Sequence, residues 1–227
     1  MRRLKLLCLG LLVAVTSAIA GPFEDGNVAF HRGDYATAMR LWRPVALQGY
    51  ASAQYGLGAM YDRGLGVPND HAQAVSWYRK AAEQGYANAQ RDLGAMYDKG
   101  LGVPKDYAKA VSWYRKAAEQ GYAIAQHDLG QMYEQGLGVP KDYAQAVPWY
   151  RKAAEQGLAD AQQNLGTMYI LGQGISKDLQ QAYFWLLLAS VAGGEQTVKL
   201  RDMAGPLLTP QQRAAAQAEA RDWRPKK

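Results

Sequence analysis

Residues 87–122 read ANAQRDLGAMYDKGLGVPKDYAKAVSWYRKAAEQGY, and the segments on either side repeat this pattern every 36 residues. One glycine and one tryptophan mark the period in each copy. These residues are Gly58, Gly94, Gly130 and Gly166, and Trp77, Trp113, Trp149 and Trp185. A fixed period of this length is typical of stacked structural repeats, in which each unit contacts only its neighbours. The sequence therefore predicts an all-α solenoid with an extended surface, rather than a globular fold around a reaction pocket.

Each copy carries the signals of two helices joined by a short loop. In residues 87–122, apolar residues at helical spacing, such as Leu93, lie on one face of a first helix. Gly100 follows that stretch, and glycine readily adopts the left-handed conformation that ends many helices. Asp106 precedes the second apolar stretch, where a carboxylate can accept hydrogen bonds from the free amides of a helix N-terminus. We therefore expect two antiparallel helices per repeat, the second from about Tyr107 to Gln120.

Three segments recur together in each of the three copies within residues 51–158: Ala-x-Ala-Gln-x-x-Leu-Gly-x-Met-Tyr, then Gly-x-Gly-Val-Pro-x-Asp, then Ala-x-x-Trp-Tyr-x-Lys-Ala-Ala-Glu-Gln-Gly. With these segments the chain resembles the Sel-one-like repeat family, a relative of the tetratricopeptide repeats. Residues 87–158 match closely, residues 51–86 match nearly as well, and weaker ends extend the match from about residue 27 to residue 194. The resemblance implies a right-handed α-solenoid of helix-turn-helix repeats that holds protein partners. Some members have been assigned enzyme activities, but no motif in this chain would carry one over.

The repeats and their flanks divide the chain into distinct parts. We expect a signal peptide at residues 1–20, a degenerate N-terminal repeat at 21–50, four repeats at 51–86, 87–122, 123–158 and 159–194, and C-terminal capping helices at 195–227. In the last repeat Leu187 and Leu188 replace an Arg-Lys pair, so its second helix needs cover from the final helices. The alternative is that Leu186, Leu187 and Leu188 form a partner or dimer site.

Two further features lie on the expected outer face of the second helices. Each inner copy has an Arg-Lys pair followed by a glutamate, as in Arg115, Lys116 and Glu119, at spacings that allow ion pairs within a helix. The glutamates partly neutralise this charge, so a basic surface for polyanions is not favoured. Pro148 stands in mid-helix, where it predicts either a kink or a tolerated defect on the outer face.

The first twenty residues have the layout of a secretory signal peptide. Arg2, Arg3 and Lys5 precede an apolar run, and Ala18-Ile19-Ala20 offers a cleavage site. We expect cleavage after Ala20 and a location in the periplasm or outside the cell. The apolar run is short for a membrane span, so an uncleaved anchor is the less favoured alternative, and no other stretch is expected to cross a membrane. Cleavage would leave 23 basic against 20 acidic residues, and this net charge of +3 gives no strong argument for nucleic acid or anionic membrane as a partner.

The first helices carry a set of positions that differ between repeats, at offsets 0, 3, 4 and 7, which lie on one helix face. We call these positions the first-helix stripe; they are residues 52, 55, 56 and 59 and their equivalents 36, 72 and 108 residues later. First helices line the concave groove of tetratricopeptide-like solenoids, so the resemblance implies a binding groove on this stripe. The candidate partner-binding residues are Tyr55, Asn88, Arg91, Asp92, Ile124, His127, Asp128, Gln131 and Gln163. The alternative is a solvated face that drifts without selection.

Residues that could carry chemistry do not converge in the sequence. His31, His71 and His127 occupy unmatched positions of different repeats, and no pair has metal-ligand spacing. The recurring Gly-Leu-Gly of the loops lacks the strand and the trailing Gly-Lys-Ser/Thr of a phosphate-binding loop. Cys8 is the only cysteine and lies in the predicted signal peptide, so the mature chain would have no disulfide. We therefore expect no catalytic residue, no metal site and no cofactor.

These observations favour an exported, non-catalytic adaptor that binds a protein or peptide partner in the groove and is itself a monomer. Two alternatives stay open. One is an envelope hydrolase acting on peptidoglycan or an amide, which would need an acid, base or nucleophile set that the sequence does not show. The other is a purely structural spacer without a partner.

Overall fold

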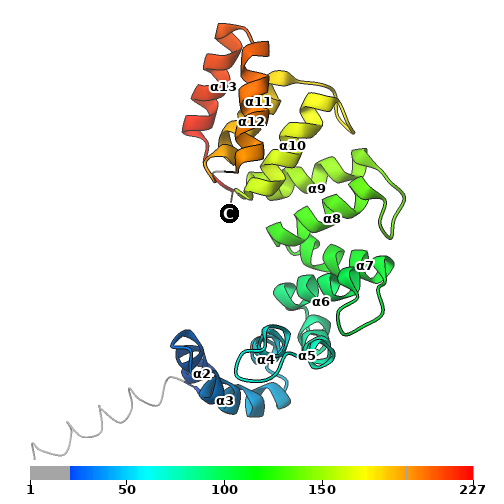
Figure 1. The fold of residues 1–227 in the computed structure, drawn as a ribbon, viewed down its shortest axis with the longest axis vertical. Helices are drawn as coiled ribbons and strands as arrows, with labels where there is room; N and C mark the ends of the chain where they lie inside the picture. Colours follow the sequence, from blue (N-terminus) through cyan, green and yellow to red (C-terminus); the bar gives the residue numbers. More distant parts are fainter. Residues whose placement is uncertain (1–20, 193, 227) are drawn as a thin grey trace, which may run out of the picture. The chain divides into compact units, whose positions relative to one another are not determined.

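The computed structural model describes residues 21–192 and 194–226, and every regular element within them is helical (Figure 1). The all-α prediction is thereby confirmed. The predicted signal peptide, residues 1–20, lies outside the described residues. The elements are α2 (Pro22–His31), α3 (Tyr35–Leu47), α4 (Ala51–Arg63), α5 (His71–Glu83), α6 (Ala87–Lys99), α7 (Tyr107–Glu119), α8 (Ala123–Gln135), α9 (Tyr143–Glu155), α10 (Ala159–Leu171), α11 (Leu179–Ser190), α12 (Glu195–Ala204), the short 3-10 helix η1 (Gly205–Leu207) and α13 (Pro210–Asp222).

The chain divides into two compact units. The first contains the described residues up to Ala89 together with Leu101–Val103, and the second contains Gln90–Gly100 and the described residues from Pro104 onward. In the first unit α2 packs on α3, α3 on α4 and α4 on α5. In the second unit each helix from α7 to α11 packs on the next, and α12 and α13 both pack on α11. Within each unit consecutive helix pairs therefore stack as in a solenoid, as predicted.

The constant glycine of each first helix leaves room for a large side chain of the second helix. A Cβ atom added to Gly130 would lie only 2.7 Å from Cδ1 and Cε1 of the buried Tyr150 ring. The same contact joins Gly94 to Tyr114. In the last repeat Gly166 faces Leu186 instead, with an added Cβ 2.9 Å from its Cγ. These glycines are constant because any side chain there would displace the partner.

Buried glutamines tie successive helices together. Gln126 Nε2 donates a hydrogen bond to the carbonyl of Ala118 at 3.1 Å, and Gln156 Nε2 donates to Gln126 Oε1 at 2.9 Å. Gln162 donates to Ala154 in the same way at 3.1 Å. A buried amide without partners would be destabilising, so each glutamine needs these contacts. The periodic Gln of the first helix and the Gln that follows α5, α7 and α9 are thus one structural device.

The loops inside the repeats have the predicted chemistry. Gly136 ends α8 in the left-handed conformation with φ of 74°, and the Asp142 carboxylate accepts a hydrogen bond from the amide of Gln145 at 3.1 Å. Gly138 also has a positive φ, and its Cα approaches the previous repeat so closely that an added Cβ would lie 2.4 Å from the carbonyl carbon of Tyr107. The second glycine of the loop is therefore needed both for the turn and for contact between repeats.

At its C-terminal end the second unit differs from the inner repeats. Leu186 is fully buried, and Leu187 and Leu188 pack against the core that α10, α11, α12 and α13 share. The final helices therefore supply the cover that this apolar helix needs. Pro148 does not interrupt α9, which continues from Tyr143 to Glu155. Because Pro148 is exposed, the backbone carbonyl that lacks its usual donor there can be hydrated.

Candidate functional site

The first-helix stripe lies at the surface, and most of its side chains are only half-buried. Two of the nine candidate residues, Tyr55 and Asn88, belong to the first unit, and the other seven belong to the second. In the first unit the Tyr55 ring lies against two other tyrosine rings, at centroid distances of 5.6 Å to Tyr78 and 5.3 Å to Tyr86. Tyr55 is thus part of an aromatic cluster at the junction of α4 and α5.

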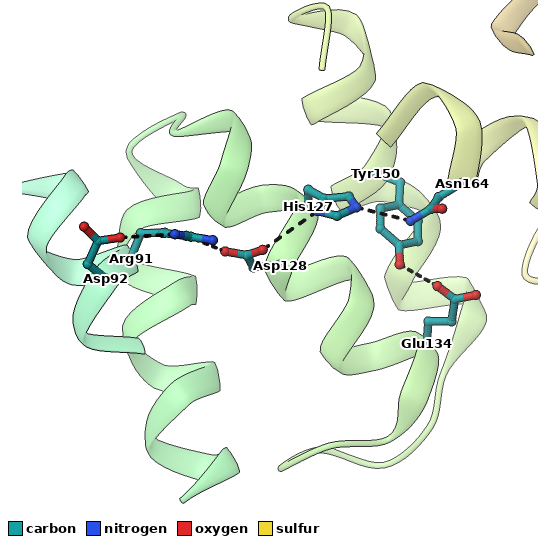
Figure 2. A network of polar contacts seen from close by, with 7 residues as sticks. All are labelled: Arg91, Asp92, His127, Asp128, Glu134, Tyr150 and Asn164. Atoms are coloured by element: carbon teal, nitrogen blue, oxygen red, sulfur yellow. Dashed lines mark hydrogen bonds and ion pairs between the residues drawn. The ribbon is translucent and has the colours of Figure 1, made fainter. Parts of the chain in front are cut away.

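In the second unit an ion pair crosses from one repeat to the next. Arg91 of α6 points its Nε at Asp128 Oδ2 of α8, 2.7 Å away, and its Nη1 lies 3.1 Å from Asp92 Oδ1 (Figure 2). The side chain of Arg91 is 31% exposed and that of Asp128 is 13% exposed. The pair is therefore neither free in solvent nor sealed in the core, and it fixes the orientation of both side chains.

The pKa of Arg91 reflects these contacts. Burial alone would lower it, but the carboxylates of Asp128 and Asp92 outweigh burial and raise the pKa above its usual value. Arg91 is consequently a permanent positive charge beside two carboxylates. This arrangement can orient a partner but has no proton to exchange near neutral pH.

The chain of polar contacts continues into the next repeat. His127 Nδ1 lies 3.8 Å from Asp128 Oδ1, and its Nε2 lies 3.2 Å from the amide nitrogen of Asn164 in α10 (Figure 2). Arg91 and Asp128 are 37 residues apart, and so are His127 and Asn164. The residue at offset 3 of one first helix thus contacts the residue at offset 4 of the next first helix. We call the contacts Arg91–Asp128 and His127–Asn164 the polar ladder.

The ladder extends to the C-terminal helices through another stripe residue. Gln163 accepts a hydrogen bond from the hydroxyl of Thr197 in α12 through its side-chain oxygen. Ile124 and Gln131 lie on the same face of α8, and Ile124 is 37% exposed. The seven predicted residues of this unit lie on this face, and four of them form a chain of three contacts: Asp92 with Arg91, Arg91 with Asp128, and Asp128 with His127.

Three residues near the ladder were not among the sequence candidates: Asn164, Glu134 and Tyr150. The Tyr150 hydroxyl donates to Glu134 Oε2 at 2.5 Å, and its ring lies 5.6 Å from that of His127 (Figure 2). Burial and the bond to Glu134 raise the pKa of Tyr150 above its usual value. A tyrosine that keeps its proton so firmly acts here as a hydrogen-bond donor and not as a base.

The sequence did contain a signal for the Glu134–Tyr150 pair. The same pairing recurs in the first repeat, where Tyr78 Oη lies 3.5 Å from Asp62 Oδ2. In the last repeat the tyrosine becomes Leu186 and the acidic position becomes Ile170, so both partners turn apolar together. Exchange of both positions at once indicates direct contact, and a comparison of the repeats with one another would have revealed it.

The spacing of Arg115, Lys116 and Lys152 suggested ion pairs with glutamates of the same helix, but these side chains contact aromatic residues. Lys116 Nζ lies over the Trp113 ring, 4.1 Å from its centroid, and Lys152 lies over Trp149 at 4.4 Å. Arg115 donates to the hydroxyl of Tyr133 at 2.6 Å. A contact between a cation and a half-buried aromatic ring can stabilise the fold as much as an exposed ion pair, because exposed ion pairs contribute little in water.

Neither a metal centre nor a membrane span emerges from the part of the chain that the structure describes. In residues 21–192 and 194–226, no group of three or more His, Cys, Asp and Glu side chains is placed to hold a metal ion. No helix in these ranges is long and apolar enough to cross a bilayer.

Stacked helix hairpins with a 36-residue period define a tetratricopeptide-like repeat protein, a class whose members present surfaces to other proteins. The chain belongs to the Sel1 repeat family, because the family model described as Sel1 repeat matches residues 51–86, 87–122, 123–158 and 159–193. Proteins built from this repeat generally serve as scaffolds for protein–protein interaction and are typically non-catalytic.

Solved structures agree with this membership. A Sel1 repeat protein from Oxalobacter formigenes is 33% identical over 90% of this chain and 86% of its own, with a TM-score of 0.76. The uropathogenic Escherichia coli protein c5321, described as a protective antigen with an SLR fold, is 34% identical over 83% of this chain and 48% of its own, with a TM-score of 0.55. A Klebsiella pneumoniae protein described as a putative sel1 repeat protein shares the fold at 23% identity, 81% and 91% coverage and a TM-score of 0.53. No curated protein showed significant similarity to the chain.

Proposed function

We propose that this protein is an exported, non-catalytic adaptor that binds a protein or peptide segment across the first-helix stripe. The stripe of the second unit offers a mixed surface: charged groups at Arg91, Asp92 and Asp128, and an apolar contact at Ile124. Such a surface suits a peptide that alternates polar and apolar side chains. The proposal goes beyond family membership by assigning the interaction to these residues.

One observation carries the proposal: the constant and the varying residues have different surroundings. The constant glycines lie against large side chains, the buried glutamines bond to carbonyls and the loop aspartates cap helices. These contacts account for the residues that every repeat shares. The stripe is the face on which repeats differ and on which side chains stay accessible.

The polar ladder adds a reason why this face suits recognition. Arg91, Asp128 and His127 already hold one another in place, so a partner would not have to order them. Surfaces whose side chains are fixed before binding lose less conformational entropy on association. The ladder thus favours specific binding over loose adhesion.

Export is the second part of the proposal. It rests on the basic, apolar and small-residue segments of residues 1–20. The relative at 34% identity is described as a protective antigen, and this description accords with an exported protein.

The test is crosslinking in cells followed by pull-down of the tagged protein, with two folded variants beside the wild type. The stripe variant combines Ile124→Glu with Gln131→Lys, which alters the face without touching the polar ladder. The matched control combines Ser112→Glu with Gln145→Lys, at exposed positions on the second helices α7 and α9. Circular dichroism establishes that both variants keep their helix content.

We expect the wild type and the control variant to recover the same partner, and the stripe variant to lose it. Equal recovery by the stripe variant would move the binding surface elsewhere and refute the assignment. Absence of any partner from the wild type would favour the structural spacer. Hydrolysis of peptidoglycan by the purified protein, abolished by one point mutation, would establish the enzyme alternative instead.

A further inference from the structure

Residues 223–226 lie against the turn that ends the third repeat. After α13 ends, the Lys226 amide donates a hydrogen bond to the carbonyl of Glu155 at 2.8 Å, and Lys226 Nζ lies 2.9 Å from Glu155 Oε2. Pro225 and Trp223 cover Gly157, where an added Cβ would lie 3.4 Å and 3.7 Å from them. A segment without regular secondary structure, 71 residues away in sequence, is thus bound here, and its Trp223 has an extended backbone.

The chemistry of this contact follows from the end of a helix. Glu155 is the last residue of α9, where carbonyl groups lack partners within the helix and the helix dipole is negative. The amides of Gly157 and Leu158 bond to the carbonyls of Ala154 and Ala153. The carbonyl of Glu155 instead accepts the tail amide, and its carboxylate adds negative charge. The site therefore selects a backbone donor and a basic side chain together.

The surface extends beyond the tail toward the preceding repeat. A shallow hollow of about 390 Å³ runs from Lys226 and Glu155 to Gln120 and Gly121, which follow α7. Lys152 also lines this hollow, and its ammonium group lies over the Trp149 ring, 4.4 Å from the centroid. The end of α7 repeats the sequence Ala-Ala-Glu-Gln-Gly, and Glu119 there is exposed. Glu155 forms an ion pair with Lys226. Within residues 21–192 and 194–226, Glu119 forms no such ion pair. Two equivalent helix ends thus lie along one edge of this unit, and the tail occupies one of them.

We propose that this edge, defined by Gln120, Gly121, Glu155 and Gln156, is a second binding site that takes an extended basic peptide segment of a partner protein. The chain's own tail, Arg224–Lys226, is a resident occupant that such a segment displaces, whereas Trp223 packs against the hydrophobic core of this unit. One backbone hydrogen bond and one ion pair hold Lys226, whose side chain is 69% exposed while that of Glu155 is 30% exposed, and ion pairs near the surface contribute little. A longer segment can make the same two contacts and also fill the hollow toward Gly121. This site is separate from the first-helix stripe and does not depend on the function proposed above.

The test uses the full chain and a fluorescent peptide with the sequence of residues 220–227, ARDWRPKK, measured by fluorescence anisotropy. Lys226→Glu weakens the resident tail, whereas Glu155→Lys removes the acceptor of the basic side chain. Asp160→Lys makes the same charge change at an exposed position of the first-helix stripe and serves as the matched control. A second peptide carries Glu in place of the Lys226 equivalent.

We expect the Lys226→Glu chain to bind the native peptide at least threefold more tightly than the wild type, and the Asp160→Lys chain to bind it as the wild type does. The Glu155→Lys chain should lose the native peptide and gain the Glu-containing one. Unchanged affinity in both Lys226→Glu and Glu155→Lys would overturn the inference. Loss of binding through Asp160→Lys alone would also overturn it, because the peptide would then bind the stripe.

Discussion

The contact between Arg91 and Asp128 should contribute measurably to the stability of the second unit, and a double-mutant cycle can isolate its contribution. The Arg91 Nε and Asp128 Oδ2 atoms are 2.7 Å apart. At that distance two unit charges attract by about 1.5 kcal/mol in water and about 6 kcal/mol at an effective dielectric constant near 20. Exposures of 31% and 13% place the pair between these limits, and loss of hydration subtracts from the attraction.

The expected coupling energy is about 1.5–3 kcal/mol, as for hydrogen bonds to charged groups. The cycle compares Arg91→Met, Asp128→Asn, the double variant and the wild type by urea unfolding followed by circular dichroism. Asp128→Asn keeps the side-chain shape, so the lost term is mainly the charge. The four proteins must share one denaturant slope for the comparison to hold.

A control cycle on Lys199 and Glu195 calibrates the result. Their side chains are 64% and 83% exposed, and an exposed pair four residues apart in a helix couples by only about 0.3–0.5 kcal/mol. If the Arg91–Asp128 coupling is no larger than this control, the pair is an ordinary surface contact. The argument that the polar ladder holds the stripe in place would then fail.

Two further predictions concern the packing around Tyr150. Gly130→Ala should lower the free energy of unfolding by about 1 kcal/mol. The reason is that overpacking against Tyr150 costs about 1–3 kcal/mol, which exceeds the gain of about 1 kcal/mol in helix propensity. An unchanged or higher urea midpoint would contradict the 2.7 Å contact. Burial raises the pKa of Tyr114 and Tyr150 above 10.0, so the folded state holds these protons more tightly and stability should fall as the pH rises above about 10. Each tyrosine adds up to about 1.4 kcal/mol per pH unit to this loss. Between pH 8 and 11 the melting temperature should therefore fall less steeply with pH when Tyr114 and Tyr150 are both changed to Phe.

Most of the fold could be predicted from the sequence because its determinants are local and repeated. Gly136 and Asp142 set the end of one helix and the start of the next through their own backbone and side-chain chemistry. The period itself shows which helices are neighbours. Residues that are constant across copies, such as Gly130, could therefore be placed in the scaffold with no structure in hand.

The ladder could not be predicted in the same way. Arg91 and His127 occupy the same position of successive repeats, but one contacts Asp128 and the other Asn164, so no single motif describes the contact. Each pairing depends on which side chain the next helix brings within reach. The role of the stripe in binding stays a prediction, and what the sequence did not show is that several of its residues already contact one another.

The apolar second helix of the last repeat limits how this protein could lengthen during evolution. An additional copy of residues 87–122, inserted after Tyr122, would find on each side the glycines, glutamines and loop aspartates that it needs for stacking. A copy added after α11 would instead separate Leu186 and its neighbours from α12 and α13, which cover them. Tandem duplication is therefore tolerated within the array and opposed at its C-terminal end. The last repeat acts as a fixed terminus, and we expect relatives of different length to differ in the number of inner repeats.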